Sequence, residues 1–190
     1  MLICLEKVIN KFINFIKCQM NHVDNSERTT KDIKRDYLRS RNMEIRELLS
    51  NEYEMALQLA WIVFQEYEGP DYSEQGIKSF YDSLHDTEYI KRLRIYGAFE
   101  HTKLIGMLAT RSDGNHIALF FVDGKYHRKG IGKQLFEKAC LDSSSGNMTV
   151  NSSPFAVEVY HHLGFIDSDI EQVTDGLRYT PMIYRLKKDN

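Results

Sequence analysis

The chain of 190 residues is 42% hydrophobic and 27% charged, which is typical of a globular protein and predicts a single domain. Its net charge of −2 argues against a protein that mainly neutralises phosphates, so no specific nucleic-acid partner is expected. Cys4, Cys18 and Cys140 are odd in number and lack disulfide or metal-ligand spacing, which indicates a reducing compartment. No apolar run approaches the ~18 residues of a membrane span, so we expect a cytoplasmic protein without a transmembrane segment.

Residues 1–42 differ in composition from the remainder and are interpreted as an N-terminal extension. Apolar residues recur at intervals of three and four over 3–20, which predicts an amphipathic helix, and the polar stretch 21–42 predicts a linker. The helix is expected to pack on this chain or on a second copy of it. A helix that lies on a membrane surface is one alternative. A segment that is not translated is another, because Met43 stands where the globular pattern begins.

From Met43 onward, hydrophobic periodicity and turn residues predict a mixed α/β sheet within one domain, 43–190. Ser112-Asp113-Gly114-Asn115 is a strong hairpin signal, and the unbroken apolar run 116–122 predicts a strand that is buried on both faces. The expected strands are 43–48, 93–100, 104–111, 116–122, 148–152, 167–174 and 180–187, and the expected helices are 51–67, 73–85, 130–141 and 154–163.

The turn after strand 116–122 carries the clearest functional signal. Gly130-Ile131-Gly132 opens a helix, where unpaired N–H groups and the helix dipole favour an anion, and glycine permits its close approach. Basic side chains surround this turn, which suits a pyrophosphate. It is not a P-loop, and it lacks the third glycine of the dinucleotide fingerprint. The basic residues are His127, Arg128, Lys129 and Lys133.

This turn, followed by a short strand and a helix that ends in Tyr160-x-x-Leu163-Gly164-Phe165, resembles the GNAT superfamily of acyl-CoA-dependent N-acetyltransferases. The resemblance covers about 43–188 and implies the acyl-CoA N-acyltransferase fold. In that fold, helices flank a central, mostly antiparallel sheet that is splayed at the cofactor site. The one departure is His127, where the family has Gln or Arg, although the backbone N–H of His127 is expected to remain usable. The implied cofactor is acetyl-CoA, bound by His127, Arg128, Lys129, Gly130, Ile131, Gly132, Lys133, Asn151, Tyr160 and the strand end at Phe121 and Val122.

The resemblance also implies catalytic roles. Tyr160 matches the general acid of the family, although a phenol is a weaker acid than a thiol and Tyr160 could simply hydrogen-bond the sulfur or pack in the core. For the general base, Glu66 and Glu68 are the first choices, ahead of Asp71 and Asp123. An exposed acidic surface is the better explanation for any single one of Glu66, Glu68 and Asp71, and the alternative for Asp123 is that it caps the turn.

The expected function is transfer of an acetyl group from acetyl-CoA to a primary amine, by direct attack in a ternary complex. The acceptor is expected to be a small-molecule or peptide amine. The alternatives are a non-catalytic acyl-CoA sensor and an acetyltransferase for protein or tRNA-linked amines. A homodimer is compatible with the family. His161 and His162 have no further ligands at metal spacing, so no metal is expected.

Overall fold

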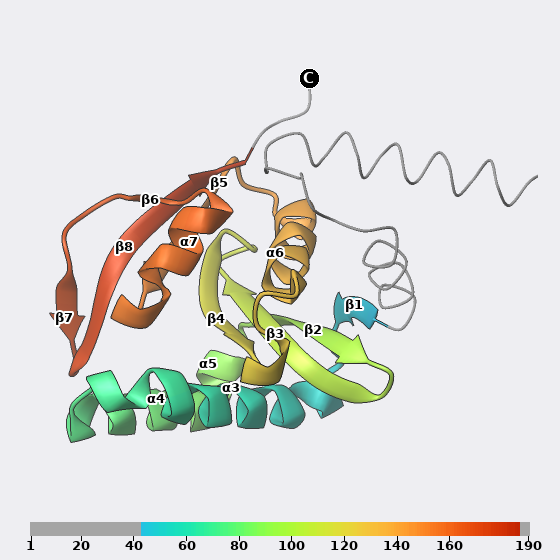
Figure 1. Cartoon of the computed structure of the whole chain (residues 1–190), viewed down its shortest axis with the longest axis horizontal. Helices are drawn as coiled ribbons and strands as arrows, with labels where there is room; N and C mark the ends of the chain where they lie inside the picture. Colours follow the sequence, from blue (N-terminus) through green and yellow to red (C-terminus); the bar gives the residue numbers. More distant parts are fainter. Residues whose placement is uncertain (1–42, 187–190) are drawn as a thin grey trace, which may run out of the picture. The chain divides into compact units, whose positions relative to one another are not determined.

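A computed structural model of the chain describes residues 43–186. The predicted helix 3–20 and its linker lie outside the described residues. Figure 1 shows a sheet with helices on both faces. The helices are α3 (Tyr53–Tyr67), α4 (Glu74–His85), α5 (Thr87–Ile90), α6 (Ile131–Asp142) and α7 (Val157–Leu163). The strands are β1 (Met43–Glu47), β2 (Arg94–Glu100), β3 (Lys103–Arg111), β4 (His116–Val122), β5 (Asn147–Ser152), β6 (Ile166–Asp167), β7 (Gln172–Thr174) and β8 (Leu177–Arg185).

The sheet has the strand order β1-β2-β3-β4-β5-β8-β6, and β7 pairs with β8. Every described pairing is antiparallel except that of β4 with β5. This parallel ladder consists only of His116 opposite Thr149 and Ile117 opposite Val150. Beyond Ile117 the two strands part, which confirms the predicted splayed sheet.

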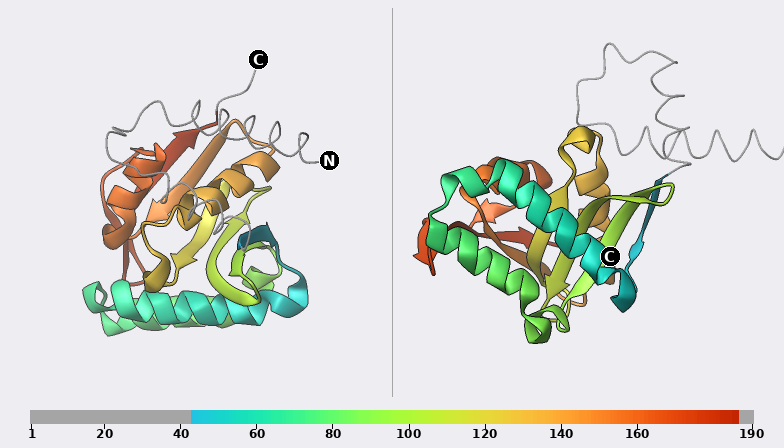
Figure 2. Two further views of the ribbon diagram at one scale, coloured as in Figure 1. Left: turned by 45° about the vertical axis from the view of Figure 1, so that its right-hand side comes forward. Right: turned by 90° about the horizontal axis from the view of Figure 1, so that it is seen from below.

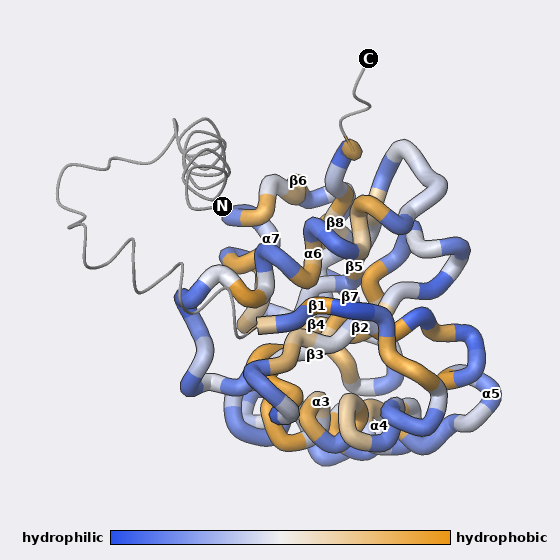
Figure 3. Tube along the Cα trace, turned by 90° about the vertical axis from the view of Figure 1, so that its right-hand side faces the viewer, coloured by the Kyte–Doolittle hydropathy of each residue, from blue (hydrophilic) through white to orange (hydrophobic). Residues whose placement is uncertain are grey.

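The sheet separates two apolar cores. On one face α3 and α4 lie side by side (Figure 2), and Phe64 of α3 packs with Leu119 and Phe121 of β4. On the other face α6 and α7 bury Leu135 and Tyr160 against the strands. Figure 3 shows the apolar stretches of the strands and of α3 where these layers meet. The helices α3, α4, α6 and α7 therefore each bury residues against the sheet.

Two details near the end of the chain differ from the sequence prediction. The predicted strand 167–174 is interrupted between β6 and β7, because the Asp169 carboxylate accepts the Ile170 N–H at 2.8 Å and draws the backbone out of the ladder. The last strand, expected from residue 180, begins at Leu177, directly after the turn at Asp175 and Gly176. Both turn residues have positive φ, of 51° and 78°, which suits a tight hairpin.

Burial along β4 also differs from the prediction. Only every second residue is buried, whereas Phe120 and Val122 are half-buried. The reason is that these side chains face the opening between β4 and β5. The short helix α5 was not predicted. It begins at Asp86, whose carboxylate accepts the N–H groups of Glu88 and Tyr89.

Candidate active site

Two pockets meet where β4 and β5 part. The turn pocket, of about 380 Å³, is lined by residues 120–122, 126–128 and 130–133, by the end of α3 at Val63 and Tyr67, and by Phe155, Ala156 and Val159. The hairpin pocket, of about 430 Å³, is lined by residues 117–121 and 177–179, and by Phe64, Tyr72, Ser79, Phe80, Ser83, Val150, Asn151, Ser153, Thr174 and Asp175. Both pockets are also lined by a shared set, namely Glu68, Phe120, Phe121, Ala156 and Tyr160.

The turn pocket contains an anion cradle at the start of α6. Gly130 precedes the helix with φ of 78°, and no side chain caps the helix N-terminus. The first N–H groups of α6 therefore have no partner within the helix and carry the positive end of its dipole. Glycine suits position 132, because a Cβ there would lie only 3.2 Å from Cζ of Phe120. These residues fit a pyrophosphate, such as that of coenzyme A.

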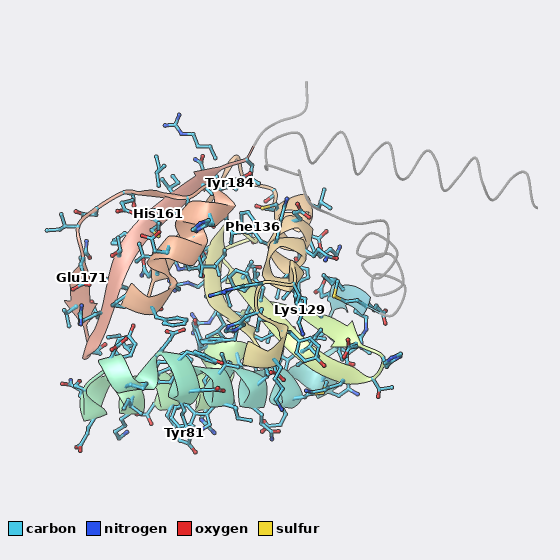
Figure 4. The ribbon with its side chains drawn as sticks, in the orientation of Figure 1. Tyr81, Lys129, Phe136, His161, Glu171 and Tyr184 are labelled. Atoms are coloured by element: carbon cyan, nitrogen blue, oxygen red, sulfur yellow. The ribbon has the colours of Figure 1, made fainter. Side chains whose placement is uncertain are left out.

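Not all of the basic residues around the cradle line the turn pocket. Arg128 and Lys133 line the turn pocket, but Lys129 does not, because its ammonium donates to the Lys125 carbonyl and lies 4.7 Å from the centroid of the Tyr126 ring (Figure 4). His127 lines the pocket with its ring, whose Nε2 lies 2.8 Å from the Val122 carbonyl oxygen.

The expectation that the His127 N–H remains available is wrong for this structure. That N–H donates to the Gly124 carbonyl at 3.2 Å, within the one-turn 3-10 helix Gly124–Tyr126. Any backbone contact to an anion therefore falls to the residues after His127.

The backbone of β4 offers a donor to the opening. The Asp123 N–H donates to the Ile105 carbonyl of β3 at 2.9 Å, and backbone groups alternate sides along a strand. The N–H of Val122 therefore points away from β3, toward the splayed side, whereas that of Phe121 points toward β3. Of the two residues that the sequence suggested, only Val122 is oriented to donate to a thioester oxygen.

Tyr160 lies in α7 at the junction of the pockets. Its ring packs on Phe120 at 6.0 Å and on Phe165 at 5.2 Å, between centroids. Burial, and then the charge of Glu68, raise the pKa of Tyr160 well above its usual range. Its hydroxyl makes no hydrogen bond within the described part of the chain. A protonated donor is thus held beside both pockets.

The structure separates the two candidate bases. Glu68, at the end of α3, lines both pockets, and burial raises the pKa of its carboxyl to about 7, against the opposing effect of a hydrogen bond with Ser153. Glu66 is exposed and lines neither pocket. Asp71 is likewise exposed. Asp123 accepts from Lys103 Nζ at 3.0 Å and from the Lys125 N–H, so its carboxylate caps the turn Gly124–Tyr126.

The remaining predicted site residue, Asn151, pairs with Pro181 of β8 and lines the hairpin pocket rather than the turn pocket. Sequence reasoning missed the residues that complete the hairpin pocket, above all Tyr72, Phe80 and Arg178, because they come from separate elements with no shared motif.

Other candidate features lie away from these pockets. His161 Nε2 lies 2.8 Å from the Asp167 carboxylate on the outer side of α7 (Figure 4). Within residues 43–186, no group of three or more His, Cys, Asp or Glu side chains is arranged to hold a metal ion. Among the same residues, no helix is long and apolar enough to cross a membrane.

Comparisons with known proteins agree with this geometry. A family model described as "Acetyltransferase (GNAT) domain" matches residues 68–186, which is more than half of the chain. No curated protein matches the sequence.

Solved structures share the fold at low sequence identity. A GCN5-related N-acetyltransferase from Rhodopseudomonas palustris is 18% identical, with a TM-score of 0.64 over 75% of this chain and 95% of that one. The PaiA N-acetyltransferase of Thermoplasma acidophilum, in complex with coenzyme A, is 23% identical, with a TM-score of 0.60 over 75% and 98%. The spermidine N-acetyltransferase of Vibrio cholerae, in complex with CoA and spermine, is 16% identical, with a TM-score of 0.50 over 76% and 96%. With the splayed sheet, the glycine turn and the family match together, this chain belongs to the GNAT acetyltransferase family.

Proposed function

We propose that the protein transfers an acetyl group from acetyl-CoA to a primary amine, by direct attack within a ternary complex. One observation carries the proposal: Glu68 and Tyr160 line both pockets at the point where they meet. Acetyl-CoA in the turn pocket and an amine in the hairpin pocket would meet at these two side chains.

The turn pocket would hold coenzyme A. The first N–H groups of α6, with Arg128 and Lys133, would bind its pyrophosphate, and the apolar side chains of Phe155 and Val159 would contact the rest of the molecule. When bound, acetyl-CoA supplies a thioester at which the C–N bond forms and the C–S bond breaks; CoA leaves as a thiolate, and the proton that the newly acylated nitrogen loses then converts it to the thiol. The N–H of Val122 is oriented to stabilise the charge that develops on the thioester oxygen.

Glu68 would prepare the acceptor. An alkylammonium with a pKa of ~10.4 resists deprotonation at pH 7 by roughly 4.6 kcal/mol. A general base works best when its pKa lies near the operating pH, and the Glu68 carboxyl has a pKa of about 7. Its Oε atoms would accept the ammonium proton, directly or through one water, and leave a neutral amine nitrogen.

Tyr160 would hydrogen-bond the leaving sulfur. Because its pKa is raised, the phenol keeps its proton and remains a donor at neutral pH. A thiolate with a pKa near ~8.5 leaves without full proton transfer, so a hydrogen bond suffices.

The test is direct. A saturating concentration of acetyl-CoA, about 100 times its Kd, should stabilise the purified full chain by about 2.7 kcal/mol in thermal unfolding. Thiol release with a panel of primary amines, with the acetylated amine identified by mass spectrometry, should then show turnover. Binding without thiol release against any amine would instead support a non-catalytic acyl-CoA-binding module. The absence of a thermal shift would contradict both functions.

A further inference from the structure

We propose that the hairpin pocket accepts a small primary monoamine with an aromatic or otherwise apolar body, in preference to a polyamine or a peptide. This inference rests on the proposed function, whose acceptor it specifies.

The first observation is an aromatic wall. Phe64 and Phe80 stack with their ring centroids 4.0 Å apart, and Phe80 lies 5.8 Å from Phe121. Tyr72 extends the array, 5.7 Å from Phe64. All four side chains line the hairpin pocket, on the side formed by α3, α4, the connection between these helices and β4. Phe64 and Phe121 are buried, so Tyr72 and Phe80, which are half-buried, are the rings that a ligand can cover with its apolar area.

The second observation is that most polar side chains of this pocket already have partners. The guanidinium of Arg178 is bound by both carboxylate oxygens of Glu171 at 3.1 Å. The hydroxyls are also engaged, as donors to the protein: Tyr72 to the Arg178 carbonyl at 2.8 Å, Ser79 to the Asp175 carbonyl at 2.8 Å, Ser83 to the Phe80 carbonyl at 2.7 Å, and Tyr179 to the Gln172 side chain at 3.1 Å. A ligand that must accept many hydrogen bonds from the pocket would have to break these, because each hydroxyl has only one proton to donate.

The third observation is the sparse negative charge. Two acidic residues line the hairpin pocket, Glu68 beside Tyr160 and Asp175 at the exposed hairpin turn. One ammonium group can pair with Glu68 and a second only with Asp175 at the exposed turn. A third ammonium group, as in spermidine, would have no acidic partner among the lining residues.

The fourth observation is a contact between the β7–β8 hairpin and α4 that closes one side of the pocket. The β7–β8 hairpin reaches α4 (Figures 1 and 2), and a Cβ on Gly176 would lie 2.7 Å from the Gly76 nitrogen. The hydrogen bond from Ser79 to the Asp175 carbonyl fastens the same contact. A polypeptide that crosses this side would have to displace the hairpin, whereas a volume of about 430 Å³ suits a small molecule.

The experiment compares acceptors on the purified full chain. Thiol release from acetyl-CoA is measured with phenethylamine, with spermidine and with a short peptide that has a free N-terminus. We expect kcat/KM for phenethylamine to exceed the other two by about tenfold or more. Phe80→Leu should lower kcat/KM for phenethylamine by about tenfold while the Kd for acetyl-CoA stays unchanged. Tyr81→Leu, an exposed aromatic neighbour outside the pocket, is the matched control and should have little effect.

A preference for spermidine or for the peptide would overturn the inference but not the proposed transferase. If no amine releases thiol, the proposed function fails, and the pocket is tested by calorimetric binding of phenethylamine to the CoA-loaded protein. Binding that Phe80→Leu abolishes supports the pocket assignment, and no binding overturns it. If Phe80→Leu does not fold, Ser83→Leu, which fills the pocket from α4, replaces it with the same expected losses.

Discussion

The turn pocket and the hairpin pocket are built in different ways. The turn pocket takes its anion cradle from a few consecutive residues, and its main donors are backbone N–H groups at a turn whose glycines are visible in the sequence. The hairpin pocket takes its lining from α3, α4, β4, β5 and the β7–β8 hairpin, and its character depends on side chains. The difference explains why a cofactor site can be recognised in a sequence whose acceptor site cannot.

The largest effect should come from the residue that the two pockets share. Glu68→Gln keeps the shape but removes the base, so kcat/KM should fall by about 10²–10⁴-fold. Because the base acts when deprotonated, wild-type kcat/KM should rise with pH through about 7, and the variant should lose that rise. The control is Glu66→Gln, which alters an exposed carboxylate outside both pockets. Equal losses in both variants would contradict the separation of their roles.

The next largest effect should fall on the turn pocket alone. Gly132→Ala places a methyl group 3.2 Å from Cζ of Phe120, so the ring or the start of α6 must shift within the turn pocket. The Kd for acetyl-CoA should rise by about tenfold, the size expected if the shift weakens one hydrogen bond to a charged group. Gly146→Ala is the matched control, because a Cβ there meets nothing within 4 Å. Isothermal titration calorimetry measures both. An unchanged Kd in the first variant would place the pyrophosphate elsewhere.

A smaller effect is expected at Tyr160, where the change removes one hydroxyl. Tyr160→Phe should lower kcat by about three- to tenfold, the value of one hydrogen bond, and leave the Kd for acetyl-CoA nearly unchanged. Tyr81→Phe serves as the control on an exposed ring. Single-turnover thiol release separates this step from product release, and an unaltered rate there would leave Tyr160 with a packing role only.

The smallest effect concerns the hairpin pocket. Ser79→Ala removes the hydrogen bond to the Asp175 carbonyl, so the free energy of unfolding should fall by about 1 kcal/mol and the Tm by about 2–4 °C. The loosened hairpin should also narrow the difference in kcat/KM between phenethylamine and the peptide. Ser83→Ala, whose hydroxyl bonds within α4, is the control for the hairpin contact. If Ser79→Ala keeps the acceptor selectivity of the wild type, the contact between the hairpin and α4 does not determine specificity.

Features that depend on consecutive residues could be predicted from the sequence, and features that depend on tertiary packing could not. The order of elements and the glycine turn were predictable because each depends on local periodicity or on adjacent residues, whereas the splayed sheet was expected only from the resemblance to the GNAT superfamily. The choice between Glu66 and Glu68 was not, because the two lie two positions apart near the end of α3 and only tertiary packing turns one of them inward. Two other details were also not predictable, because several backbone conformations could satisfy the local hydrogen bonds involved. They are the hydrogen bond of the His127 N–H within a one-turn helix and the interruption of the predicted strand near Asp169.

The short ladder between β4 and β5 has a mechanical consequence. The strands β1–β4 and the strands β5, β8 and β6 form two half-sheets, and the backbone joins them directly through the pairs at His116 and Ile117 alone. A ligand bound in the opening would contact both half-sheets, and it would accept a hydrogen bond from the Val122 N–H of β4. Ligand binding should therefore stabilise the association of the two half-sheets, and slower amide hydrogen exchange at the end of β4 would show it.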